Sequence, residues 1–149
     1  MAQIIFRGPR RMKRDHADFK YKDLTGKIIG AGMAVQSELG FGFAEKVYEN
    51  ALVIELESAG LAVQQQVPTP VYYRGELVGD YFADLIVEGK VIVELRAVAK
   101  LDPVHEVQLV NYLKATELEV GLLLNFGDRL EYKRRVFSKR ARTQMEGRA

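Results

Sequence analysis

The sequence predicts an α+β fold, an α/β sandwich in which a helical hairpin precedes a mixed β-sheet with one crossover helix. Apolar residues recur at helical spacing up to about residue 59, and from Leu61 to Val98 they alternate with a period of two. Another helical pattern then precedes the apolar run VGLLLNF, residues 120–126, which is typical of a strand buried on both faces. The order α-α-β-β-β-β-α-β fits neither a ferredoxin-like plait nor a doubly wound sheet.

Two helices are predicted before the strands. The first spans residues 24–39, and Asp23 or Thr25 is expected to cap it. The second spans residues 43–59 and stops at Gly60, a residue that commonly ends helices. Together they form the helical hairpin.

Four consecutive antiparallel strands are predicted next, near residues 63–67, 70–74, 77–87 and 91–97. Pro68 and Pro70 separate the first two, while RGEL and EGKV have the composition of hairpin turns. The crossover helix is expected to begin at Pro103 with Asp102 as its cap. After the buried run, the segment LEYKRRVF is expected to add a last short strand.

The charge of the chain is divided along its length. The net charge of +2 combines +4 in residues 1–23 and +5 in residues 128–149 with −7 between them. We therefore expect a basic N-terminal arm at residues 1–23, one domain at residues 24–137 and a basic C-terminal tail at residues 138–149. Basic arms commonly follow nucleic-acid phosphates, and solvated termini are the alternative.

The composition excludes several classes of site. The chain has no cysteine, so disulfides, thiolate nucleophiles, cysteine-ligated zinc and iron–sulfur clusters are excluded. No run of about 18 apolar residues could span a bilayer, and the N-terminal segment lacks the apolar core of a secretory signal. We therefore expect a cytoplasmic protein without a membrane partner.

The stretch FADLIVEGKVIVELRAV places two acidic residues inside apolar strands. If the hairpin turns at Glu88–Gly89–Lys90, Asp84 lies opposite Glu94, and Arg96 shares a face with Glu94. Neighbouring carboxylates repel unless a cation bridges them, and such a pair suits Mg²⁺ or Mn²⁺. The alternative is an ion pair with Arg96 on an exposed sheet face.

Four ordered motifs carry a family resemblance: GFAEKVY, YFADLIVEGKVIVELRAV, HEVQLVNYLKAT and GLLLNFG. In this order they resemble the GxxExxY protein family, a branch of the PD-(D/E)XK nuclease superfamily. The resemblance covers residues 24–134 and implies a restriction-endonuclease-like core with nuclease activity.

The resemblance implies roles for particular residues. Asp84 and Glu94 match the two metal-binding carboxylates of the superfamily, and Glu45 matches a third acidic residue that can approach the metal. Gln108 and Tyr112 match a QxxxY element that supports the site and contacts substrate, and residues four apart on a helix share a face. A core position for Tyr112 with a solvated Gln108 is the alternative.

Two residues depart from the family pattern. Gln36 stands where relatives commonly have histidine, and Arg96 stands where they usually have the lysine of ExK. Arginine can stabilise charge on a phosphate, but it cannot act as a base. A metal that lowers the pKa of its water could supply that base.

The leading hypothesis is a metal-dependent nuclease acting on DNA in preference to RNA. Glu45, Asp84 and Glu94 would bind Mg²⁺ or Mn²⁺, and Arg96 would stabilise the transition state. One alternative is a catalytically weakened member that binds nucleic acid, and another is a self-associating protein that forms homo-oligomers. The pair Tyr72–Tyr73 could stack on bases, although strand tyrosines more often serve packing.

Overall fold

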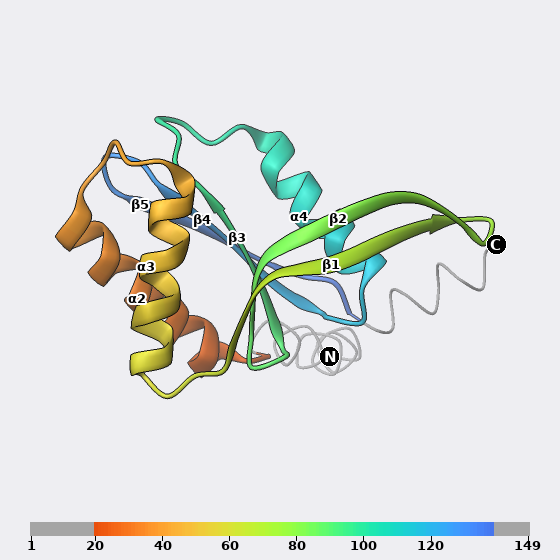
Figure 1. Cartoon of the computed structure of the whole chain (residues 1–149), viewed down its shortest axis with the longest axis horizontal. Helices are drawn as coiled ribbons and strands as arrows, with labels where there is room; N and C mark the ends of the chain where they lie inside the picture. The colour runs from red at the N-terminus through yellow and green to blue at the C-terminus, as the bar shows by residue number, and fades with distance from the viewer. Residues whose placement is uncertain (1–19, 139–149) are drawn as a thin grey trace, which may run out of the picture.

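The computed structural model describes residues 20–138, and there it places helices on both faces of one five-stranded sheet (Figure 1). This arrangement confirms the predicted α+β class. The basic segments 1–19 and 139–149 lie outside the described residues. In chain order the elements are α2 (Lys22–Leu39), α3 (Glu45–Ser58), β1 (Val63–Tyr73), β2 (Glu76–Val87), β3 (Val91–Arg96), α4 (Pro103–Ala115), β4 (Val120–Phe126) and β5 (Leu130–Val136).

The strands lie in the sheet in the order β1-β2-β3-β4-β5. Strands β3 and β4 are parallel, whereas every other neighbouring pair is antiparallel. A parallel pair needs a crossover connection, and α4 supplies it between β3 and β4. The last strand, β5, confirms the expectation for LEYKRRVF.

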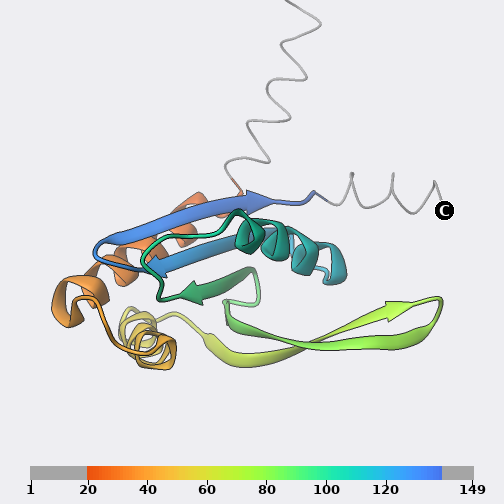
Figure 2. The same ribbon diagram turned by 90° about the horizontal axis from the view of Figure 1, so that it is seen from above.

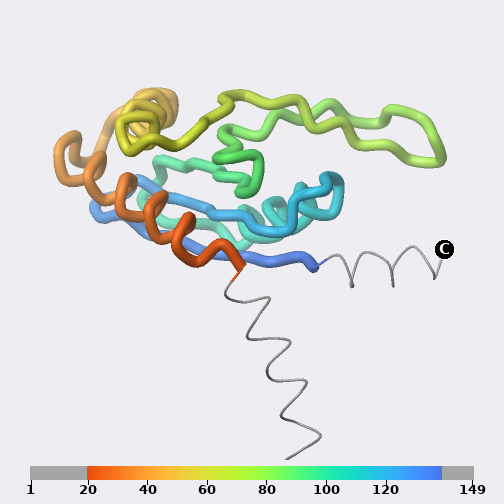
Figure 3. Tube along the Cα trace, turned by 90° about the horizontal axis from the view of Figure 1, so that it is seen from below, coloured from red at the N-terminus to blue at the C-terminus, as the bar shows by residue number. Residues whose placement is uncertain are grey.

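Two hydrophobic cores form on opposite faces of the sheet. Successive strand residues point to opposite faces, so the buried residues Ile92 and Val93 belong to different cores. Helices α2 and α3 cover one face, where Tyr48 stacks on Phe126. Helix α4 covers the other face through Leu109 and its neighbours (Figure 2). From below, α2 lies across β4 and β5 (Figure 3).

The predicted break between two strands at residues 67–70 is wrong. One continuous strand, β1, runs through both Pro68 and Pro70. β1 is an edge strand that pairs only with β2 in the described part of the chain. Proline removes a backbone donor, and an edge strand tolerates this loss because one of its sides has no ladder to interrupt.

Both predicted hairpin turns are confirmed. Arg74 and Gly75 have φ of 50° and 80°, and Glu88 and Gly89 have φ of 56° and 62°. Two successive positive φ angles are the signature of a type I′ turn, which matches the twist of the flanking strands. The distal parts of β1 and β2 project beyond the other three strands as a two-stranded ribbon, residues 67–82, which we call the arm (Figures 1 and 2).

The helix ends follow the predictions in part. Asp102 caps α4 as expected, because its carboxylate accepts from the Val104 N–H at 2.9 Å. The expected cap of the first helix is wrong: α2 begins after Tyr21, without a side-chain cap. Thr25 lies inside the helix and donates to the Lys22 carbonyl. None of the helices in residues 20–138 is long and apolar enough to cross a membrane.

Candidate active site

The site lies at a fork between β2 and β3. The two strands pair only from Val87–Val91 to Leu85–Val93, and then β2 departs into the arm while β3 continues beside β4. Asp84 and Glu94 are the next residues on the two branches, so they lie opposite one another as the predicted register required. Asp84 Oδ2 accepts from the Leu95 N–H at 2.9 Å, which satisfies a donor that the departing strand leaves without a backbone partner.

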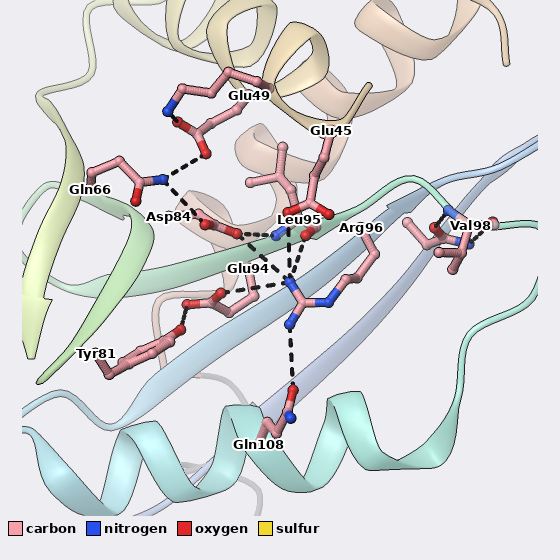
Figure 4. Close-up of polar contacts among 12 residues, drawn as sticks. Glu45, Glu49, Gln66, Tyr81, Asp84, Glu94, Leu95, Arg96, Val98 and Gln108 are labelled. Carbon is pink, nitrogen blue, oxygen red and sulfur yellow. Dashed lines mark hydrogen bonds and ion pairs between the residues drawn. The ribbon is translucent and has the colours of Figure 1, made fainter. Parts of the chain in front are cut away.

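Three carboxylates from three elements surround the guanidinium of Arg96. Arg96 Nη1 lies 3.9 Å from an oxygen of each of Glu45, Asp84 and Glu94 (Figure 4). Glu45 is the first residue of α3, while Asp84 and Glu94 lie on the forked strands. Glu94 is only 3% exposed, so its carboxylate is held almost without water.

Gln108 and Tyr112 reach the same site from α4. Gln108 Oε1 accepts from Arg96 Nη2 at 3.4 Å. Tyr112, one turn further along the helix, stacks on Tyr81 with ring centroids 3.3 Å apart and planes at 13°. Tyr81 in turn donates a hydrogen bond to Glu94. The structure therefore brings together all six residues that the sequence nominated.

Sequence reasoning missed Tyr81. It lies on β2, three residues before Asp84, and links the Tyr112 ring to the Glu94 carboxylate. A tyrosine in an alternating strand gives no local sign of such a contact, because the contact depends on how β2 turns away from β3. The hydrogen bond from Tyr81 reaches Glu94 from the side opposite Asp84 and Glu45 (Figure 4).

A second layer of polar side chains holds Asp84, and sequence reasoning did not predict it. Gln66 Nε2 donates to Asp84 Oδ1 at 3.3 Å and to Glu49 Oε1 at 2.9 Å (Figure 4). Glu49, only 2% exposed, also accepts from Lys46 and Gln65 at 2.7 and 2.5 Å. Both oxygens of Asp84 are thus engaged, which fixes its orientation. The i, i+4 spacing of Glu49 from Glu45 was the available sequence signal.

The site raises the pKa of several of its groups. Burial, followed by the charge on Asp84, raises the pKa of Glu94 to about 8 despite the nearby arginine. Burial also raises the pKa of Glu45, and Arg96 opposes that shift. The pKa of Tyr81 is raised by burial and then by the charge of Glu94, so its hydroxyl stays protonated as a donor. Burial thus disfavours the ionised forms of Glu45 and Glu94.

The side-chain amides of Gln36 and Asn125 form hydrogen bonds with the backbone near the site. Gln36 donates from Nε2 to the Gly127 carbonyl at 2.8 Å and so joins α2 to the loop after β4. Asn125, fully buried, accepts from the Val98 N–H at 3.0 Å and donates to the Val98 carbonyl at 2.9 Å. This pair of bonds holds the chain that follows Arg96.

The donor set fits a divalent metal, but Arg96 shares the space. Three carboxylates are the ligands that a hard cation such as Mg²⁺ prefers. Burial and then the charge of Asp84 raise the pKa of Glu94, so a bound cation would favour its ionised form. In residues 20–138, however, no group of three or more His, Cys, Asp or Glu is gathered closely enough to hold a metal ion. The guanidinium lies among the three oxygens instead.

Comparison with known proteins identifies the family. A family model described as the PD-(D/E)XK nuclease superfamily matches residues 22–136, from the first residue of α2 to the last of β5. No curated protein and no solved structure matches the chain. The helices and the five-stranded mixed sheet are consistent with a restriction-endonuclease-like core. PD-(D/E)XK nucleases generally use divalent metals, and their substrates are nucleic acids. With the match covering more than half of its length, the chain belongs to the PD-(D/E)XK nuclease superfamily.

Proposed function

We propose that the protein is a metal-dependent nuclease that hydrolyses phosphodiester bonds in DNA. The observation that carries the proposal is the convergence of Glu45, Asp84 and Glu94, from three different elements, around one cation. A purely structural role gives no reason to bring three carboxylates together in a partly buried fork. The resemblance of the ordered motifs to the GxxExxY branch supports the same function.

Glu45, Asp84 and Glu94 would hold Mg²⁺ or Mn²⁺. When bound, such an ion supplies Lewis-acid chemistry, because it lowers the pKa of water and neutralises charge on a phosphate. Gln66 and the Leu95 N–H orient Asp84, and Tyr81 orients Glu94. These contacts set the orientation of Asp84 and Glu94 before a metal arrives.

Arg96 and the α4 residues would act on the substrate. The guanidinium presents a planar fork of donors that suits two phosphate oxygens, so Arg96 would bind and stabilise the charge that develops there. Gln108 Oε1 accepts a hydrogen bond from Arg96 Nη2 at 3.4 Å. Tyr112 would support the site through its stack on Tyr81.

The flanking basic segments would hold the nucleic-acid backbone. We keep residues 24–137 as the catalytic domain, with segments 1–23 and 138–149 as sources of sequence-independent affinity for phosphates. DNA is the proposed substrate, and RNA is the competing one that the experiment includes.

A second candidate is a catalytically weakened nuclease fold that binds nucleic acid or self-associates. The observation that favours it is the position of Arg96, which contacts the carboxylates where the family usually has lysine. An arginine has no capacity to accept a proton from water. Activity that emerges only in Arg96→Lys would establish this alternative.

The test is metal-dependent cleavage by Glu94→Gln and Asp84→Asn beside the wild-type chain. Linear and circular DNA, single- and double-stranded, and RNA are incubated with Mg²⁺ or Mn²⁺. We expect wild-type cleavage of DNA, and a loss of about a hundredfold or more in either variant because a metal ligand is removed. Glu57→Gln is the matched control, since Glu57 is an exposed glutamate on α3. Equal cleavage by wild type and Glu94→Gln would exclude the proposed site.

A further inference from the structure

The guanidinium of Arg96 forms ion pairs with the three carboxylates but donates no hydrogen bond to them. Its Nη1 lies 3.9 Å from Glu45 Oε1, Asp84 Oδ2 and Glu94 Oε2, a distance beyond the usual 2.7–3.2 Å of an N–H···O hydrogen bond. The guanidinium instead donates hydrogen bonds at 2.7 Å to the carbonyl of Leu95 and at 3.4 Å to Gln108 Oε1. Moving the guanidinium away from the carboxylates therefore breaks no direct hydrogen bond with them.

The position of Arg96 conflicts with a metal on the same ligands. Mg²⁺ requires oxygen ligands at about 2.0–2.1 Å, so the three carboxylates must draw closer together than they are around Nη1. A guanidinium and a divalent ion cannot share that space, because they would both clash and repel. The two cations must exclude one another.

Arg96 has a neighbouring position to move into. Gln108 on α4 already accepts from its other terminal nitrogen, on the side facing away from Glu45 (Figure 4). The side chain is only 20% exposed, so it is confined between the forked strands and α4. A shift toward Gln108 would keep one hydrogen bond and vacate the space between the carboxylates.

We propose that Arg96 is an internal counter-cation that holds the three carboxylates together without metal and that a divalent ion must displace toward Gln108. The inference rests on the proposed function and deepens it, because the displaced guanidinium would then meet the scissile phosphate. Arg96 thus sets the metal concentration at which the site fills. A family lysine, with a single compact ammonium, lacks the second nitrogen that bridges to Gln108.

The first test is Mn²⁺ binding by calorimetry to the full-length chain, without nucleic acid. Arg96→Ala and Arg96→Gln both remove the competing charge, so we expect their Kd for Mn²⁺ to fall by roughly tenfold or more. Arg129→Ala, which removes an exposed arginine in the loop after β4, should stay within about twofold of wild type. If Arg96→Ala fails to fold, Arg96→Gln, which keeps a polar amide, carries the comparison.

The second test observes the arginine itself. In ¹⁵N-labelled wild-type protein, the Nε–H resonance of Arg96, assigned by its absence in Arg96→Lys, should shift as Mg²⁺ is titrated. A resonance that does not move at saturating Mg²⁺ would overturn the displacement.

The outcomes separate this inference from the proposed function. Unchanged Kd values in both Arg96 variants, with Mn²⁺-dependent cleavage by wild type, would overturn the displacement and leave the nuclease proposal standing. Absence of Mn²⁺ binding in wild type and both variants would overturn the two proposals together. Mn²⁺ binding by both Arg96 variants with none detectable in wild type would be the strongest form of the expected result.

Discussion

The surroundings of Glu94 oppose its negative charge. It is nearly inaccessible to water and faces Asp84 across the fork, whereas the hydrogen bond from Tyr81 and the charge of Arg96 favour its ionised form. Burial and the charge of Asp84 raise its pKa from the ordinary value of 4.5 to about 8. Because a raised carboxyl pKa means that the folded state binds the proton more tightly than the unfolded state, folding is opposed as that proton is lost.

The raised pKa predicts how stability depends on pH without metal. Between about pH 4.5 and pH 8 the unfolded chain loses the Glu94 proton before the folded chain does, so the free energy of unfolding should fall as pH rises, by up to about 1.4 kcal/mol per pH unit. Glu94→Gln has no such proton, and its stability should fall less steeply. Urea unfolding in EDTA across this range measures both slopes.

The matched control for this prediction is Glu57→Gln. It removes an exposed carboxyl from α3, so it should keep the wild-type slope. Parallel pH profiles for wild type and Glu94→Gln would show that the proton on Glu94 does not couple to folding.

At the scale of the elements, α4 and β4 approach each other closely at Gly121. A Cβ added there would lie 2.7 Å from Leu109 Cδ1 and 3.1 Å from its Cγ. Leu109 lies on the side of α4 that faces the sheet and is fully buried, so its side chain has little room to move. The glycine lets α4 lie near enough to the sheet for Gln108, the neighbour of Leu109, to reach Arg96.

Gly121→Ala should therefore destabilise the fold. We expect a loss of about 1–3 kcal/mol in the free energy of unfolding, because the added methyl overpacks the contact with Leu109. Gly26→Ala on α2 is the control, since nothing lies within 4 Å of its added Cβ and alanine favours a helix. Chemical denaturation measures both; a neutral Gly121→Ala would show that α4 can move outward freely.

The elements also show which parts of the fold sequence reasoning can predict. The turns at Arg74–Gly75 and Glu88–Gly89 were predictable, because a type I′ turn is specified by two local residues. The second turn set the register that places Asp84 opposite Glu94. The continuity of β1 through Pro68 was not predictable, since an edge position is a property of the whole sheet.

In the candidate site, too, some residues can be predicted from the sequence and others only from the structure. The six nominated residues came from ordered motifs, and the fold gathers them. Tyr81 and Gln66 came only from the structure, because their contacts depend on how β2 leaves the sheet. Nor does any feature of the sequence indicate that Arg96 Nη1 lies 3.9 Å from each of the three carboxylates.

At the scale of the whole molecule, the arm is the feature that departs most from a closed sandwich. It extends the two strands that carry Gln66, Tyr81 and Asp84, so it starts at the candidate site and runs outward (Figure 3). Near its tip Tyr72 and Tyr73 are 63% and 60% exposed, and the Arg74 guanidinium lies 5.1 Å from the Tyr73 ring centroid. Exposure this high argues against a packing role for these tyrosines.

The double substitution Tyr72→Ser, Tyr73→Ser separates packing from base stacking. Because both rings are mostly exposed, the free energy of unfolding should change by less than about 1 kcal/mol. If the rings stack on bases, the affinity for single-stranded DNA should fall by roughly fivefold to a hundredfold, since each stack is worth about 1–3 kcal/mol. Fluorescence anisotropy in a Glu94→Gln background measures affinity without cleavage.

The control for the arm is Tyr132→Ser, which removes a tyrosine of 48% exposure from β5, at the opposite edge of the sheet. It should leave the affinity for single-stranded DNA within about twofold of the background, because β5 does not border the fork. Equal losses in both variants would indicate a diffuse effect of surface tyrosines. Unchanged affinity in the arm variant, together with normal stability, would mean that a nucleic acid at the carboxylates does not reach the tip of the arm.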